Sequence, residues 1–133
     1  MVRRFAFFRS DRGAAAAEFA LVAPMFFALV FGVINFAALL FAYVNLHWAT
    51  ENAARCYAVN TTVCTSATTT QTYAANHYQG PGISASFVAT TTGNCHKTNG
   101  TSDGHNVTGT GGYTINAVLA TQTISLSSAA CFP

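Results

Sequence analysis

Charged residues are scarce in this chain. They make up 8% of its 133 residues, whereas globular domains carry about a quarter. The net charge of +2 is too small to indicate binding to nucleic acid. Between Phe19 and Thr50 there is no Asp, Glu, Lys or Arg, and about 20 apolar residues suffice to cross a bilayer as a helix. The shortage of charge therefore excludes an ordinary soluble domain and predicts a membrane-spanning segment.

The few cationic residues are unevenly distributed. Only Arg55 and Lys97 lie beyond Gly13, and the other four precede it: Arg3, Arg4, Arg9 and Arg12. Cationic residues flanking a membrane segment stay on the cytoplasmic side. We therefore expect a single-pass topology in which the N-terminus is cytoplasmic and everything after about Tyr43 is exported.

The chain has four cysteines, and all of them fall in the expected exported part: Cys56, Cys64, Cys95 and Cys131. An even number of cysteines in an oxidising compartment predicts two disulfides, for which three pairings exist. We favour Cys56–Cys64 as a local link at a helix end and Cys95–Cys131 as a link from a long loop to the C-terminus. A zinc site with His77, His96 or His105 is the alternative, but the spacing lacks a CxxC or HxxxH pair. We expect no metal.

Catalytic signatures are also lacking. The exported part has only Glu51 and Asp103 as acidic residues, and no Gly-x-Ser-x-Gly, HExxH or phosphate-binding loop occurs. Cys95 and His96 are adjacent, but an oxidising compartment favours a disulfide over a reactive thiol. The sequence therefore indicates neither an enzyme nor a cofactor.

What the chain does have is a long helical pattern, from residue 14 to about residue 60. Its first part is apolar all round, as a lipid-embedded helix is, with Pro24 as an interruption. From Asn45 the pattern becomes amphipathic, with a Glu51–Arg55 pair expected on one face. The expected buried face of this second part consists of Leu46, Ala49, Ala53 and Tyr57.

The rest of the chain predicts a small α+β domain. Residues 66–78 form a candidate short helix, and residues 83–91 alternate as a half-buried strand does, with Ile83, Ala85, Phe87 and Ala89 on one face. Residues 113–128 show the same alternation and could be one bent strand or two. The Gly-, Asn- and Thr-rich residues 91–112 are expected to be a loop. We predict two or three antiparallel strands packed on the emerging helix.

The stretch RGAAAAEFALVAP, preceded by a short basic leader, resembles the signal of type IV pilins. With the later NAAR it is more narrowly similar to TadE-like pseudopilins of the tight-adherence (Flp pilus) system, over about residues 9–56. The resemblance implies that a prepilin peptidase cuts between Gly13 and Ala14. Glu18 would then be the fifth residue of the mature chain, followed by Phe19, with Pro24 at the position usual in TadE-like proteins.

The resemblance implies a leader over residues 1–13 and a transmembrane and assembly helix over 14–60. The cysteines and the strand patterns add an exported, disulfide-linked domain over 61–133. The chain would be a structural pilus subunit in the bacterial inner membrane. Its partners would be the peptidase, the assembly platform and other pilin subunits, and it would contribute to filament assembly and adhesion. Whether it is a major or a minor subunit stays open, although the family favours a minor one.

Glu18 has two interpretations. Its carboxylate could pair with the new ammonium group of Ala14 in an adjacent subunit, as the family implies, or it could extend to the nearby cytoplasmic interface. Two other readings of the whole N-terminal region also stay open. One is a secretory signal cut near Ala38, and the other is an uncleaved anchor that presents a small periplasmic binding domain.

Overall fold

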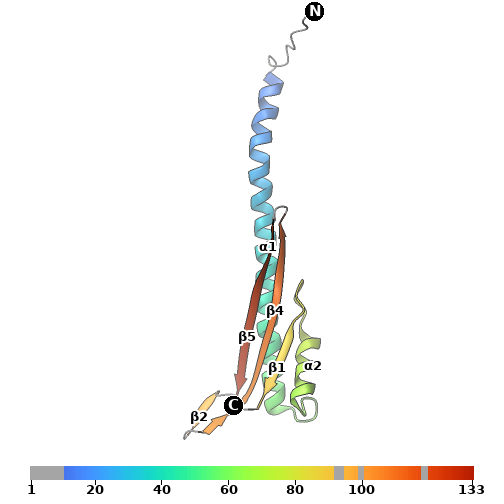
Figure 1. Cartoon of the computed structure of the whole chain (residues 1–133), viewed down its shortest axis with the longest axis vertical. Coiled ribbons are helices and arrows are strands. Elements are labelled where there is room, and N and C mark those ends of the chain that lie inside the picture. Colours follow the sequence, from blue (N-terminus) through green and yellow to red (C-terminus); the bar gives the residue numbers. More distant parts are fainter. Residues whose placement is uncertain (1–10, 92–94, 99–100, 118–119) are drawn as a thin grey trace, which may run out of the picture. The chain divides into compact units, whose positions relative to one another are not determined.

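The computed structural model describes residues 11–91, 95–98, 101–117 and 120–133. For residues 11, 12, 14, 96–98, 101–103, 116, 117 and 120 it describes the backbone alone. Helices and strands follow one another as α1 (Asp11–Val59), α2 (Ala67–His77), β1 (Ser86–Thr90), β2 (His96–Thr98), β3 (Thr101–Asp103), β4 (His105–Ala117) and β5 (Ala120–Phe132) (Figure 1). The α+β class expected from the sequence is confirmed. The chain divides into two compact units, one ending at Phe36 and the other beginning at Ala37.

The first unit consists, in its described part, of the apolar beginning of α1, which starts within a few residues of the predicted boundary. Pro24 lies inside the helix. Large apolar side chains are exposed at consecutive positions, so they point in every direction around the helix axis. They include Phe19, Leu21, Val22, Met25, Phe26, Phe27, Leu29, Phe31, Val33, Ile34 and Phe36. The prediction of a helix that is apolar all round is confirmed.

The second unit is built around the end of α1. Leu46, Ala49 and Ala53 are fully buried there, and Tyr57 is half-buried, which confirms the amphipathic face read from the sequence. The rest of the hydrophobic core comes largely from the sheet and includes Phe87, Ala89, Val107, Tyr113 and Leu126. A helix with small residues on its inner face allows the sheet to pack closely against it.

The main sheet has three antiparallel strands in the order β1-β4-β5. Phe87 of β1 pairs with Gly109 of β4, and β4 pairs with β5 from His105↔Phe132 to Ala117↔Ala120. Residues 113–128 therefore belong to two strands. Residues 113–117 belong to β4, and residues 120–128 belong to β5. Of the apolar residues that alternate in this segment, Tyr113 and Leu126 are buried as expected, Ile124 is exposed, and Leu119 lies outside the described residues.

The prediction that residues 91–112 form a loop is wrong for much of this segment. β2 and β3 pair as a small hairpin, and residues 105–112 are the first part of β4. Val107 is fully buried, and a Cβ added at Gly109 would lie 2.7 Å from Thr50 Cγ2 and 3.0 Å from Leu46 Cδ1. Glycine therefore serves here to bring β4 against α1, a use that composition does not distinguish from a loop.

The short helix predicted over residues 66–78 is present as α2, and its caps explain how a threonine-rich segment becomes helical. Ser66 Oγ accepts from the backbone N–H of Thr69, while the Ser66 N–H donates to Thr69 Oγ1 at 2.9 Å. This reciprocal pair satisfies two donors that would otherwise lack partners at the helix start. Ala74 is buried in the core, and α2 lies beside β1 (Figure 1).

Two disulfides link elements of the second unit, in the pairing that the sequence favoured. Cys56 near the end of α1 is joined to Cys64 just before α2, with 5.8 Å between their Cα atoms. Cys95 before β2 is joined to Cys131 near the end of β5, with 5.3 Å between Cα atoms. Both Cα separations are typical of disulfides.

Candidate processing and assembly site

The residues expected to carry processing and assembly all lie on the beginning of α1. Gly13 is exposed, and a Cβ added there would meet nothing within 4 Å. Ala14 follows it in the helix. Glu18 comes one helical turn of about 3.6 residues later and is exposed. Helical geometry therefore places the backbone of Ala14 and the carboxylate of Glu18 on the same face.

The surface around Glu18 is apolar. Phe19 is 71% exposed, and farther along the helix Phe27 makes an edge contact with Phe26 and stacks on Phe31. By its length and composition, α1 from Ala15 to Val59 is able to cross a membrane. So much contiguous exposed apolar surface is typical of contact with lipid or with another protein.

Two asparagines interrupt the apolar surface, and each one bonds within the helix. The side-chain amide of Asn35 donates to the carbonyl of Phe31, and that of Asn45 donates to the carbonyl of Phe41, both at 2.8 Å. One N–H of each amide is thus satisfied within the helix, as is common for a polar side chain on a helix.

The prediction that Glu51 pairs with Arg55 is wrong. Glu51 Oε1 lies 3.4 Å from His47 Nε2 instead, and the Arg55 guanidinium lies over the ring of Phe132, 5.6 Å from its centroid. The cause is tertiary, because the β5 residue Phe132 offers Arg55 an aromatic face. Spacing along the helix alone could not reveal it.

His47 also joins a polar link between α1 and β5 that the sequence did not reveal. Its Nδ1 lies 2.9 Å from Ser128 Oγ, and Ser128 Oγ lies 3.1 Å from Thr50 Oγ1. The Thr50 hydroxyl donates to the backbone carbonyl of His47 at 2.7 Å. Ser128 and Thr50 are buried, so this network satisfies polar groups inside the core. Ser128 lies too far along the chain for any local pattern to have linked it to His47.

The other described histidines contact aromatic rings. His77 stacks on Tyr73 with 4.0 Å between ring centroids, and His105 lies 4.4 Å from Tyr57. All four cysteines, which a zinc site would need as ligands, are joined in disulfides. Within the described part of the chain, no three potential ligand side chains gather.

Comparison with protein families identifies the beginning of the chain. Residues 13–55 match the family model of TadE-like proteins. This segment is similar to that family. The match begins at Gly13 and contains Glu18, Phe19 and Pro24, and it extends along α1 to Arg55. Neither a curated protein nor a solved structure matches the chain.

The match covers less than half of the chain and shows a likeness of this segment to TadE-like proteins. By length and composition, the apolar helix within it is able to cross a membrane. The matched segment spans both the exposed apolar part of α1 and its buried end. The sheet and all four cysteines of the two disulfides follow Arg55 and lie beyond the match. They are described by the structure alone.

Proposed function

We propose that this TadE-like chain is a minor structural subunit of a tight-adherence pilus. Prepilin peptidase cuts between Gly13 and Ala14 and removes the leader, residues 1–13. Residues 14–60 then hold the subunit in the inner membrane, and residues 61–133 form the exported, disulfide-linked domain. The observation that carries this proposal is the TadE-like match, which begins at Gly13 and continues along an exposed apolar helix.

Glu18 is the proposed assembly residue. An unpaired ion in the membrane costs several kcal/mol, and pairing reduces this cost. Cleavage after Gly13 creates an ammonium group at Ala14, which supplies the opposite charge. Pairing of Glu18 in one subunit with Ala14 in the next then sets the step between subunits, while Phe19 and the apolar residues that follow, around Pro24, pack helix on helix.

The exported domain gives the subunit its contacts outside the membrane. Helix packing joins the subunit to other pilins on the assembly platform, and the second unit is displayed for adhesion. The function is mechanical, with no cofactor and no reaction performed by the chain itself. The chain is instead the substrate of the peptidase.

Processing is tested by intact mass of the protein purified from its own host. The wild type is expected to lack the first 13 residues and four hydrogens, the latter from two disulfides. Gly13→Ala is expected to retain the full length. A mature-length Gly13→Ala product would contradict the peptidase assignment.

Assembly is tested separately by Glu18→Ala, which is expected to leave insertion and cleavage intact and to reduce incorporation into filaments. Asp103→Ala is the control, because it removes a carboxylate from the exported part of the chain outside α1. Equal incorporation of wild type and Glu18→Ala would refute the pairing role.

An uncleaved anchor that presents a binding domain is the second candidate, favoured by a groove of about 530 Å³ beside β5 in the second unit. The same intact mass decides between the two. A purified chain that still begins at Met1 supports the anchor.

A further inference from the structure

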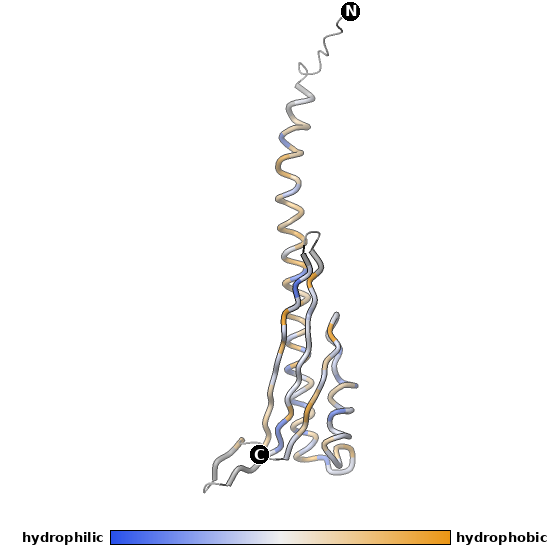
Figure 2. The backbone as a smooth tube through the Cα atoms, in the orientation of Figure 1, coloured by the Kyte–Doolittle hydropathy of each residue, from blue (hydrophilic) through white to orange (hydrophobic). Residues whose placement is uncertain are grey.

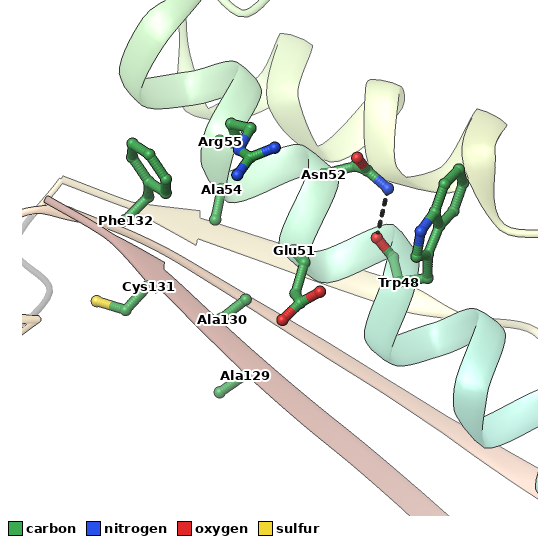
Figure 3. A pocket seen from close by; sticks show the side chains of 9 residues that line it. All are labelled: Trp48, Glu51, Asn52, Ala54, Arg55, Ala129, Ala130, Cys131 and Phe132. Carbon is green, nitrogen blue, oxygen red and sulfur yellow. Dashed lines mark hydrogen bonds between the residues drawn. The ribbon is translucent and has the colours of Figure 1, made fainter.

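A groove lies in the second unit where α1 faces β5 (Figure 3). It has a volume of about 530 Å³. The α1 side is lined chiefly by Trp48, Glu51, Asn52 and Arg55, and the β5 side by residues 129–132. Side chains of a strand alternate between its two faces. Because four consecutive residues line the groove, both faces of β5 contribute to it, as is possible along the edge of a strand.

β5 is the last strand of the main sheet, so its outer edge has no neighbour among the described strands. Alternate residues along such an edge direct their N–H and C=O groups outward. None of the turn, loop and cap hydrogen bonds found among the described residues involves the backbone of β5. These outward groups are thus available to an extended chain.

The two edges of the sheet are treated differently. β1 has 5 residues, and α2 lies beside it. β5 has 13 residues, pairs with β4 without interruption, and contains neither proline nor a charged residue. Short length, helical cover, proline and charge are the usual means by which proteins prevent pairing at an edge. The β1 edge has two of these protections, whereas the β5 edge has none.

The α1 wall of the groove has the composition of a protein interface. Trp48 is 57% exposed, and tryptophan and arginine are the residues most enriched where binding energy concentrates. Glu51 lies beside His47, whereas Arg55 lies over the Phe132 ring and forms no salt bridge among the described residues. The groove therefore offers a cation that an incoming carboxylate can neutralise.

A second copy of this chain does not fit the edge. Antiparallel pairing of two β5 strands would relate the two copies by a twofold axis perpendicular to the strands. The α1 segments of the two second units would then run in opposite directions. This step rests on the proposed function, because copies anchored through α1 in one membrane all run the same way. The only other edge of the main sheet, that of β1, lies beside α2.

We propose that the outer edge of β5 and its groove bind an extended segment of a different polypeptide. This segment adds to the sheet as an antiparallel strand beside β5 and places an acidic side chain against Arg55. Backbone hydrogen bonds supply affinity, as in other cases of strand addition, and the carboxylate fixes the register. The partner is thus a protein with an exposed acidic β-forming segment.

Site-specific photocrosslinking in the native host tests the proposal on the full chain. Variants carrying p-benzoylphenylalanine at Ser127 or at Ala129, both exposed on β5, are irradiated, and the adducts are mapped to individual residues by mass spectrometry. The control places the same group at Thr68, which is exposed on α2. Both β5 positions are expected to label one segment of one other polypeptide, and the site labelled from Ala129 should precede the site labelled from Ser127 by about two residues.

The role of Arg55 is tested in the same assay. Arg55→Glu is expected to lower the adduct yield from Ala129 about tenfold, and Arg55→Lys to retain most of it. Intact mass showing both disulfides verifies that each variant is folded. The proposal would be overturned by adducts to the chain's own sequence or by labelled sites scattered over a partner. It would also be overturned if the β5 positions gave no more adduct than Thr68, or if Arg55→Glu and the wild type gave equal yields. If the proposed pilus function were wrong, the intact mass would be that of the uncleaved chain, and the adducts formed from β5 would be unaffected.

Discussion

Both parts of α1 carry apolar residues, but these residues lie in opposite environments. Up to Phe36, leucine and methionine are exposed, as in Leu21 at 78% and Met25 at 79%. After Ala37, Leu46, Ala49 and Ala53 are fully buried under the sheet. Figure 2 shows apolar residues along both parts of the helix. Hydropathy alone therefore does not distinguish a helix face that has a partner within the chain from one that does not.

The difference lies in the size and spacing of the residues. The buried face of the second part is mostly alanine, which permits close approach of a strand that carries Gly109 opposite Leu46 and Thr50. The first part carries large side chains on all sides, so no single face is suited to a sheet. Its apolar surface needs lipid or neighbouring helices, and the second part needs only its own domain.

The largest expected effect comes from reduction of the two disulfides. It should unfold the second unit and leave the apolar first part of α1 helical. Loop-closure entropy gives about 4 kcal/mol for Cys95–Cys131 and about 2.5 kcal/mol for Cys56–Cys64. Together these approach the whole stability of a small domain. Under dithiothreitol in micelles, backbone amides of residues 86–132 should lose protection from hydrogen exchange, while those of residues 15–36 keep it. Simultaneous loss in both regions would show that the two units are not independent.

A pair of leucine substitutions gives the next largest effect. Leu46→Ala leaves a cavity in the core and is expected to reduce the free energy of unfolding by about 3 kcal/mol. Leu21→Ala, in the exposed part, is expected to change it by less than about 0.5 kcal/mol. Urea unfolding followed by fluorescence of Trp48, the single tryptophan, measures both. Similar losses for the two variants would contradict the assigned environments.

The same substitution at two glycines should have opposite effects. Gly109→Ala forces a methyl group to within 2.7 Å of Thr50 Cγ2 and 2.9 Å of the Phe87 ring, at an expected cost of about 2 kcal/mol. A Cβ added at Gly32 meets nothing within 4 Å, and alanine is the better helix former by about 1 kcal/mol. Gly32→Ala should therefore slow hydrogen exchange around residue 32 and leave the urea midpoint of the second unit unchanged. A stabilising Gly109→Ala would mean that β4 does not lie so close to α1.

The smallest effect concerns a polar group left unsatisfied in the second unit. Tyr78 Oη is buried without a hydrogen-bond partner among the described residues, and burial raises the pKa of Tyr78 above 10.0. The unfolded chain then releases its proton at lower pH than the folded one, so stability falls as pH rises above about 10. Tyr78→Phe should remove this decline and add up to about 1 kcal/mol at about pH 8. Identical urea midpoints for variant and wild type at both about pH 8 and about pH 10.5 would contradict this account.

Local patterns in the sequence were sufficient for much of the fold. The span of α1, the face formed by Leu46, Ala49 and Ala53, and the short helix α2 all depend on contacts or caps within a few residues. The strand character of residues 86–90 follows from alternation. The TadE-like segment was likewise evident, because its distinguishing residues are consecutive.

The errors arose where distant residues decide the outcome. Residues 105–112 were read as loop because Gly, Asn and Thr dominate them, yet their pairing with β1 and β5 makes them strand. Helical spacing predicted an ion pair between Arg55 and Glu51, whereas Arg55 makes a cation–π contact with Phe132 of β5. Neither the link from His47 to Ser128 nor the groove beside β5 had a signal in the local sequence.

The sequence by itself determined the long apolar helix, the TadE-like character of its beginning and the number of cysteines available for disulfides, because each depends on composition or on near neighbours along the chain. Only the tertiary structure decided which glycines lie in a strand, which partners Arg55 and His47 have, and that the edge of β5 is left open. Those features depend on which strands pair and on how closely the sheet approaches α1, and close packing between segments far apart in sequence sets both.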